Sequence, residues 1–217
     1  FAGYDAGGII EEYVVRYIKE LSRFADVHYL SDGEMSSAEL KKIEPYTKSA
    51  QCHRHGAYDF GSYAFLAQEI VGWEAIAQYD ELLLINDSCY CLHALDTLFA
   101  TMDQKSGDFW GIQATKGMGM SQRPVVYSEE NLRLVKPAHD MNALNETFES
   151  ESFYDLHVGS YFIAFRKNVF MDPDFRLAIA AVKKESDKAN IVINYEIGLT
   201  HLLLRKGYVV DTFIPNL

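Results

Sequence analysis

Residues 81–88 have the sequence ELLLINDS, in which four apolar side chains, 82–85, precede a polar triplet. A short apolar run that ends in turn-forming residues is typical of a buried strand. In open α/β sheets, ligands bind beyond the carboxyl ends of such strands, so Asp87 is the first candidate functional residue. The alternative is a local role, in which Asp87 or Ser88 caps a helix starting near His93 or stabilises a turn.

Helical and extended patterns alternate on both sides of this strand. Amphipathic spacing and stop signals predict helices over 9–21, after Ser36, over 62–71, over 93–102 and over 195–206, where Gly207 ends the last one. Apolar runs predict strands at 27–30, 49–52, 82–85, 109–113, 161–165 and 208–213. This order predicts an α/β fold with a mostly parallel central sheet and helices on both faces.

Composition limits the class of protein. With 217 residues, of which 48% are hydrophobic, the chain can form one domain over 1–217. A net charge of -11 argues against nucleic acid as a partner, because such proteins present basic surfaces to phosphates. No apolar run is long enough to cross a membrane, and three cysteines without a metal-binding spacing favour reduced thiols in the cytoplasm.

The periodicity fails between residues 115 and 155, where glycines and prolines stand among charged residues. Long irregular segments in compact domains are often binding loops or lids, so we expect a substrate-side insertion over 115–155. A helix over 141–149 would shorten it, and the alternative is a surface loop without function. The opening at Phe1 suggests a domain excised from a longer chain.

A second candidate loop spans residues 53–61, HRHGAYDFG. Arg54 has the fork geometry that binds a diphosphate, and Asp59 can accept hydrogen bonds from sugar or ribose hydroxyls. The structural alternative is an ion pair between Arg54 and Asp59 that closes a turn, with Tyr58 and Phe60 as core anchors.

Six segments in the same order are similar to those of a known bacterial family. They are the opening YD at 4–5 with its following glycines, YDFGSY at 58–63, YDELLLINDS at 79–88, DFWG at 108–111, HVGSYF at 157–162 and YEIGLT at 195–200. On these segments the chain resembles the rhamnan synthesis protein F family. The resemblance implies a Rossmann-like, GT-A-like glycosyltransferase fold that moves a sugar from a nucleotide donor onto a growing glycan.

The chain also departs from the family pattern. Gly3 stands where members have a histidine, and Gly159 stands where they have a glutamine. The loop before YDFG differs as well: members have an arginine and an asparagine ahead of a glycine, and His53, His55 and Ala57 fill those places here unless Arg54 shifts by one position. These departures concern the donor sugar, which the resemblance leaves as rhamnose or a related deoxysugar or hexose.

The resemblance assigns the donor side of the site to the strand ends. Asp87 lies in a partial D-x-D motif, which in GT-A enzymes holds Mg²⁺ or Mn²⁺ on the diphosphate. With one carboxylate instead of two, His157 or Arg54 is an alternative carrier of the compensating charge. Tyr4 and Asp5 follow the first strand and are expected to face the nucleotide, and Asn86 and Ser88 to contact the donor.

The acceptor side requires a general base. Glu196 matches the position at which inverting GT-A enzymes place it, with Asp155 as the reserve candidate. The alternative for Glu196 is a favourable interaction with the positive end of a helix dipole, since acidic residues are common in first turns.

The resemblance implies a dTDP- or UDP-sugar donor and a glycan acceptor, which could be lipid-linked. It implies activity in the cytoplasm or at the inner face of the membrane. A non-catalytic sugar-binding module on the same fold is the alternative that the single carboxylate of NDS favours. A nucleotidyltransferase would be expected to show a glycine-rich phosphate loop followed by lysine, which is not visible in the sequence.

Overall fold

The computed structural model describes residues 1–115 and 157–214. Their strands are β1 Ala2–Gly3, β2 His28–Ser31, β3 Ser49–Cys52, β4 Glu81–Ile85, β5 Phe109–Gly111, β6 Ala114–Thr115, β7 His157–Val158, β8 Phe162–Arg166 and β9 Val210–Thr212. A parallel sheet has the order β1-β2-β3, a second has the order β4-β8-β5-β9, and β6 pairs with β7. A parallel bridge between Ala2 and Asn86 places β1 beside the end of β4, so the two larger sheets continue into each other.

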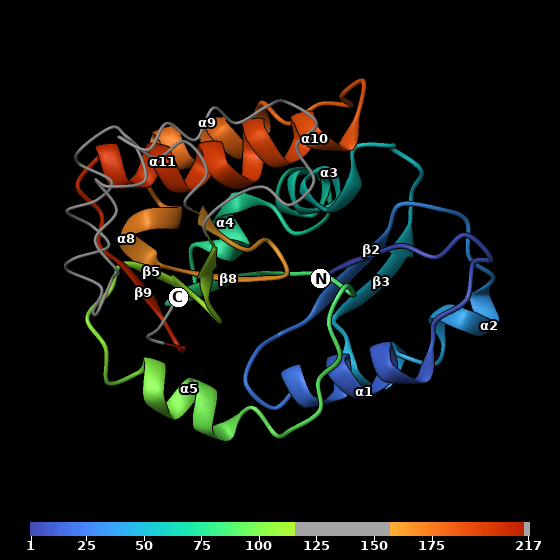
Figure 1. Ribbon diagram of the computed structural model, residues 1–217. Coiled ribbons are helices and arrows are strands. Elements are labelled where there is room, and N and C mark those ends of the chain that lie inside the picture. The colour runs from blue at the N-terminus through green and yellow to red at the C-terminus, as the bar shows by residue number, and fades with distance from the viewer. Residues whose placement is uncertain (116–156, 215–217) are drawn as a thin grey trace, which may run out of the picture.

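Helices cover both faces of this layer (Figure 1). They are α1 Glu12–Leu21, α2 Ser37–Leu40, α3 Tyr58–Phe65, α4 Trp73–Ile76, α5 Asp96–Met102, α8 Lys167–Phe170, α9 Pro173–Ala180, α10 Lys188–Ile191 and α11 Gly198–Arg205. Two π-helical segments, Leu66–Ile70 and Val192–Ile197, extend α3 and connect α10 to α11. Helices α1 and α5 lie on one side of the sheet, and α3, α4 and α8 to α11 lie on the other (Figure 1).

Strand β8 shows how the sheet separates two cores. Ile163 and Phe165 pack in the cluster that includes α3, α9 and α11, whereas Phe162 and Ala164 pack in the cluster that includes α1 and α5. All four side chains are buried, because alternate residues of a strand point to opposite faces and here both faces are covered by helices.

The α/β class and the helices on both faces are confirmed, and each predicted strand overlaps an observed one. The expectation of a mostly parallel sheet is confirmed for β1, β2 and β3 and for the β5-β9 pair, and β8 is the antiparallel exception in the two larger sheets. The second sheet is mixed because β8 runs antiparallel to both β4 and β5, while β5 and β9 are parallel. Apolar runs do not encode strand direction, since parallel and antiparallel strands are equally apolar when both faces are covered.

Several helix boundaries differ from the predicted ones. Helix α3 begins at Tyr58 rather than residue 62, and α5 begins at Asp96 rather than residue 93. The final helical region begins at Lys188 rather than residue 195. The predicted signals at Ser36, which accepts a hydrogen bond from Glu39 N, and at Gly207, with φ of 86°, are confirmed.

Residues 116–156 and 215–217 lie outside the described part of the chain. The expected insertion therefore lies outside it apart from Thr115, as do the helix expected over 141–149 and the reserve base Asp155. Among the described residues, no helix combines the length and the apolar character needed to cross a membrane.

Candidate functional site

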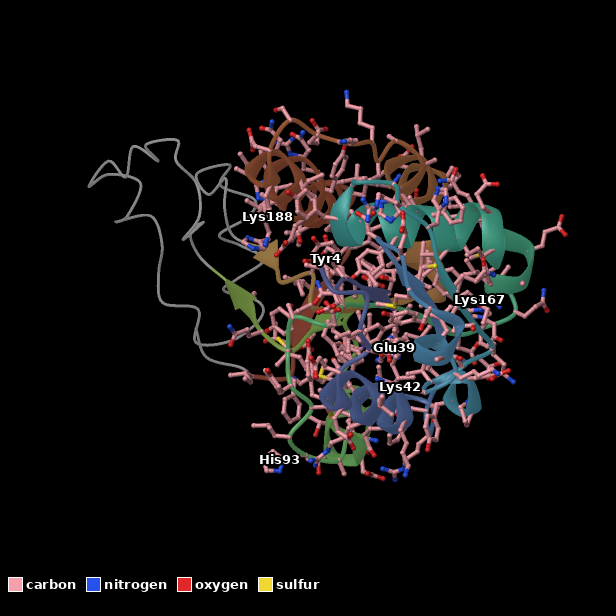
Figure 2. The ribbon with its side chains drawn as sticks, turned by 90° about the vertical axis from the view of Figure 1, so that its right-hand side faces the viewer. Tyr4, Glu39, Lys42, His93, Lys167 and Lys188 are labelled. Atoms are coloured by element: carbon pink, nitrogen blue, oxygen red, sulfur yellow. The ribbon has the colours of Figure 1, made fainter. Side chains whose placement is uncertain are left out.

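The carboxyl ends of four strands meet at one edge of the sheet. Strands β1, β2 and β3 are parallel neighbours, and the bridge to Asn86 adds the end of β4. Tyr4 follows β1, Asp32 follows β2, His53 follows β3 and Asn86 follows β4. Tyr4 lies between the helix layers in the view of Figure 2 and is 65% exposed. This edge therefore gathers polar groups from four separate segments.

Asp87 is fixed by contacts that are distant in sequence. Its Oδ2 atom accepts a hydrogen bond from Tyr4 N at 2.7 Å, and its carbonyl oxygen accepts one from the Tyr13 hydroxyl at 2.9 Å. The helix-cap alternative is wrong for Asp87, because α5 begins at Asp96, whereas the contact of its carboxylate with its own backbone agrees with the turn alternative. It holds for Ser88, whose N and Oγ atoms both donate to Asn86 Oδ1. Burial raises the pKa of Asp87.

Asp59 forms the centre of a hydrogen-bond network. Its Oδ2 atom accepts from Asn86 Nδ2 and from Ser160 Oγ, both at 2.9 Å, and Oδ1 accepts from the Phe60 amide. Burial raises the pKa of Asp59, and the negative charge of Glu196 adds to that effect. The network joins the end of β4, the start of α3 and the turn before β8.

The alternative of an ion pair between Arg54 and Asp59 is wrong. No ion pair joins these two described residues, and Arg54 is exposed. Of the two expected core anchors, Phe60 is buried but Tyr58 is 44% exposed. Tyr58 also has a φ of 56°, a left-handed conformation that is unusual for a bulky residue and often occurs at functional sites.

Glu196 lies within a π-helical segment in the middle of the helical region that runs from α10 to α11. The helix-dipole alternative is therefore wrong, because that effect is confined to the first turn. Glu196 Oε1 accepts a hydrogen bond from Ser160 N at 3.1 Å and lies 3.2 Å from His157 Nε2. Single-turn π segments inside helices occur frequently at functional sites.

Ser160 was not predicted individually, although it lies in the HVGSYF segment. It donates to Asp59 through Oγ and to Glu196 through its amide, and its carbonyl accepts from the Tyr63 hydroxyl at 3.0 Å. A buried serine that binds two carboxylates holds them at a fixed separation. No sequence signal marks this role, because it depends on a turn that packs between two helices.

Asp32 was also missed, and it organises the loop after β3. Its Oδ1 atom accepts from His55 N and from Gly56 N, both at 2.9 Å. His55 Nδ1 accepts from the Ala57 amide, so Nε2 carries the proton toward Ser62 Oγ at 2.9 Å. Burial lowers the pKa of His55, which agrees with a neutral ring. Asp32 thus fixes the loop after β3 through its backbone amides, while the side chain of Arg54 remains exposed.

Asp5 lies at the exit of β1 as expected, and its Oδ1 atom accepts from Gly7 N and Ile9 N. The loop is compact at Gly8, where a Cβ would lie 2.5 Å from the Glu34 carbonyl oxygen. Asp5 therefore shapes the glycine turn that borders the rim.

The carboxylate oxygens at this edge fit a cation that is held jointly by the protein and by substrate phosphates. The described residues contain no group of three or more His, Cys, Asp or Glu side chains that could enclose a metal. Mg²⁺ usually keeps several waters and binds through one or two carboxylates together with substrate phosphates. Asp87 satisfies that smaller requirement, whereas His157 Nε2 faces Glu196.

The described residues form an α/β fold with a cluster of acidic side chains at the strand ends. The family described as rhamnan synthesis protein F matches residues 27–216. The chain belongs to this family, which confirms the resemblance drawn from the six segments. No curated protein matches the chain.

Three solved structures overlap with the fold at low similarity. Core-mannan synthase A from Aspergillus fumigatus, in a Mn/GDP form, has a TM-score of 0.45 at 12% identity, covering 98% of this chain and 72% of that one. The mannosyltransferase Ktr4p from S. cerevisiae in complex with GDP has a TM-score of 0.46 at 8% identity, covering 97% of this chain and 66% of that one. A further structure of Ktr4p from S. cerevisiae has a TM-score of 0.44 at 8% identity, covering 90% of this chain and 61% of that one. Likenesses this distant carry no conclusion about substrate or mechanism.

Proposed function

We propose that this protein is a glycosyltransferase that moves a sugar from a nucleotide-sugar donor to a growing cell-surface polysaccharide or lipopolysaccharide on a Rossmann-like, GT-A-like fold. Membership of the rhamnan synthesis protein F family supports the class of product. The observation that carries the proposal is the bracing of Asp59 and Glu196 by Ser160 beside Asp87. It provides acidic groups for a donor and for an acceptor at one edge of the sheet.

Glu196 acts as the general base in this proposal. An inverting transfer needs a carboxylate within hydrogen-bond reach of the acceptor hydroxyl as that oxygen attacks the anomeric carbon. The Ser160 amide and the His157 ring both contact Oε1, so they hold the carboxylate in one orientation. Proton removal at the acceptor oxygen then coincides with departure of the nucleoside diphosphate. Asp155 remains the reserve base.

The donor lies over the strand ends. Tyr4 and Asp5 face the nucleotide at the exit of β1, and Arg54 reaches the diphosphate from its exposed position. Asp59, Asn86 and Ser88 supply polar atoms toward the hydroxyls of the ribose or the sugar.

Asp87 would hold Mg²⁺ or Mn²⁺, with His157 as a further candidate ligand. When bound, such a cation neutralises charge on the leaving diphosphate. The buried position of Asp87 favours this pairing, because a partly desolvated carboxylate is stabilised by a nearby positive charge.

The donor sugar is rhamnose or a related sugar on dTDP or UDP, and the acceptor is a glycan that is lipid-linked or free. The transfer would take place in the cytoplasm or at the inner face of the membrane. A non-catalytic sugar-binding module is the competing function, because NDS offers one carboxylate instead of the two of D-x-D.

The deciding experiment incubates the protein with dTDP-rhamnose, UDP-sugars and GDP-sugars, with and without Mn²⁺, and measures nucleoside diphosphate release. Transfer or slow hydrolysis of one donor that requires Glu196 supports the glycosyltransferase. A protein that binds rhamnan oligosaccharides yet neither binds nor cleaves any donor would instead be a sugar-binding module. Thermal shifts with each nucleotide provide an independent measure of donor binding.

A further inference from the structure

A pair of tyrosines lies beside Asp87 on the side of the sheet that α1 covers. The rings of Tyr13, on α1, and Tyr90, in the loop after β4, have centroids 4.3 Å apart at an interplanar angle of 37°. Tyr90 is 67% exposed although its ring packs against that of Tyr13. The pair therefore presents an aromatic surface to solvent at the rim of the site.

One stripe of α1 anchors the loop that carries Tyr90. Arg16 Nη2 donates to the Leu92 carbonyl at 3.1 Å, and Glu20 Oε1 accepts from Leu95 N at 3.0 Å. Tyr13, Arg16 and Glu20 are spaced by three and four residues, so they lie on the same face of the helix. The exposed ring is held in place before any ligand arrives, which lowers the entropy cost of binding.

A hydrogen bond links this aromatic surface to the acidic centre. The Tyr13 hydroxyl donates to the Asp87 carbonyl at 2.9 Å, and the Tyr4 amide donates to the Asp87 carboxylate. A ligand lying on Tyr90 would consequently be close to groups that the proposed reaction uses.

The charges around the pair favour a neutral ligand over an anionic one that is bound without a cation. After burial, which is the largest cause, the carboxylates of Asp87, Glu11 and Asp5 raise the pKa of Tyr13. Arg16 is close by but binds the Leu92 carbonyl. An anionic unit that lay on the tyrosine pair without a cation would meet these carboxylates unfavourably, whereas a neutral saccharide would not. The donor diphosphate differs, because the cation proposed at Asp87 would compensate its charge.

We propose that Tyr13 and Tyr90 form a stacking subsite for a neutral pyranose unit of the acceptor glycan. The inference rests on the proposed function, which it deepens by naming where the acceptor binds. The ring of Tyr90 covers the apolar C–H face of one sugar unit, while polar groups at the rim meet its hydroxyls. Tyrosine suits this task because it combines a large rigid ring with a polar end.

The test compares Tyr90→Ala with Tyr90→Phe, which keeps the ring. An α-linked rhamnose trisaccharide is titrated into each protein without nucleotide, with binding followed by saturation-transfer NMR, and dTDP and UDP are titrated separately. We expect Tyr90→Ala to weaken trisaccharide binding by roughly fivefold, the scale of one aromatic contact, and Tyr90→Phe to stay near wild type. Leu177→Ala is the matched control, because Leu177 is also 67% exposed but lies on α9.

Unchanged trisaccharide binding by Tyr90→Ala, or no binding by the wild type, overturns the subsite. Loss of dTDP or UDP binding in Tyr90→Ala also overturns it and assigns the ring to the nucleotide. Failure of the proposed function is distinguishable, because then the wild type releases no nucleoside diphosphate from any donor while its trisaccharide binding still responds to Tyr90. Where transfer is measurable, Tyr90→Ala should raise the KM for acceptor and leave the KM for donor unchanged.

Discussion

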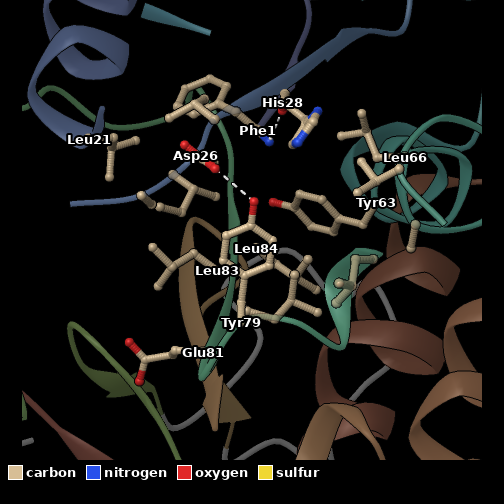
Figure 3. Close-up of a pocket in the computed structure, with 17 residues that line it drawn as sticks. Phe1, Leu21, Asp26, His28, Tyr63, Leu66, Tyr79, Glu81, Leu83 and Leu84 are labelled. Carbon is tan, nitrogen blue, oxygen red and sulfur yellow. Dashed lines mark hydrogen bonds between the residues drawn. The ribbon is translucent and has the colours of Figure 1, made fainter. Parts of the chain in front are cut away.

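The two edges of the central sheet differ sharply in chemistry. At the carboxyl ends of β1 to β4, hydrogen bonds between Asp87, Asp59 and Glu196 and their neighbours cross from one segment to another. At the opposite edge, the starts of β2 and β4 border a cavity of about 130 Å³ (Figure 3). Its lining is mostly apolar and includes Leu66 and Leu84.

Polar groups at the cavity edge also pair between segments that are distant in sequence. The Tyr79 hydroxyl donates to Asp26 at 2.7 Å across the mouth of the cavity, as the dashed line in Figure 3 shows. Burial also raises the pKa of Glu81 in the cavity lining, but Glu81 lies 3.6 Å from Arg166 Nη1 and accepts a hydrogen bond from Trp110.

At the other edge burial raises the pKa of Asp87 and Asp59, and no lysine or arginine of the described residues forms an ion pair with either. A cavity alone therefore does not identify the site. Partly buried carboxylates without a cationic partner are the better indicator, because their unfavourable burial persists only where other contacts hold them in place.

The largest effect should follow from Glu196→Gln. The amide keeps an oxygen acceptor for the Ser160 amide but cannot remove a proton, so we expect transfer to fall by roughly 10²- to 10⁴-fold. Donor binding, measured by thermal shift, should remain. Glu74→Gln on α4 is the control, since Glu74 is exposed and lies away from the strand ends. If the transfer rate of Glu196→Gln stayed within tenfold of the wild-type rate, Glu196 would not be the general base.

Asp87→Asn should have the next largest effect. Loss of the ionised carboxylate should weaken Mn²⁺-dependent nucleotide binding by roughly 10- to 100-fold, as for other ligands that hold a metal. Because burial raises the pKa of Asp87, the wild type should lose this binding on acidification at a higher pH than an ordinary carboxylate would. Titrations with dTDP and Mn²⁺ across pH test both points.

The Asp87→Asn variant should show little pH dependence of Mn²⁺-dependent nucleotide binding. Asp80→Asn is the control, because Asp80 is exposed just before β4. If nucleotide binding by Asp87→Asn and by wild type depended equally on Mn²⁺, Arg54 rather than a cation at Asp87 would neutralise the diphosphate.

Much of the fold was predictable because burial is periodic. The α1 side chains Val14, Tyr17, Ile18 and Leu21 are all buried, as their spacing indicated. Strand direction was not predictable, and β8 shows why, since its apolar run fits either direction. Helix α9 was missed although Asp172 caps it and Pro173 begins it, because no apolar stripe stands out in the sequence around it.

The candidate site was predictable where a residue follows a strand directly. Tyr4, Asp5 and Asp87 lie at strand ends as expected. Ser160 and Asp32 were not predictable, because their importance comes from partners more than 20 residues away, such as Glu196 and His55. Sequence patterns report local periodicity, whereas these contacts depend on which loops the topology brings together.

Leu66→Ala examines the apolar edge. Leu66 is 7% exposed and lines the cavity, so its truncation should enlarge the void and destabilise the fold by about 2 kcal/mol. Urea denaturation measures the loss, with the exposed Leu177→Ala expected within about 0.5 kcal/mol of wild type. Transfer by the folded fraction should be unchanged. A loss of transfer without a loss of stability would make the cavity part of the site and break the contrast between the edges.

Asp59→Asn should give the smallest effect, and its sign depends on pH. Because the pKa of Asp59 is raised by burial in the folded protein, its ionisation opposes folding, so this contribution to wild-type stability is present at low pH and is lost as pH rises through the folded pKa. Asparagine does not ionise. The stability of Asp59→Asn relative to wild type should therefore increase with pH, by on the order of 1 kcal/mol.

Urea denaturation of both proteins from acidic to neutral pH measures this trend, with the exposed Asp80→Asn as a control that should show none. Glu196 adds to the raised pKa of Asp59, so the trend should shrink when both proteins also carry Glu196→Gln. A trend of the same size in both backgrounds would mean that burial alone acts on Asp59. An opposite trend, with Asp59→Asn losing relative stability as pH rises, would mean that Asn86 and Ser160 stabilise the ionised carboxylate, and the acidic edge would then be no more strained than the apolar one.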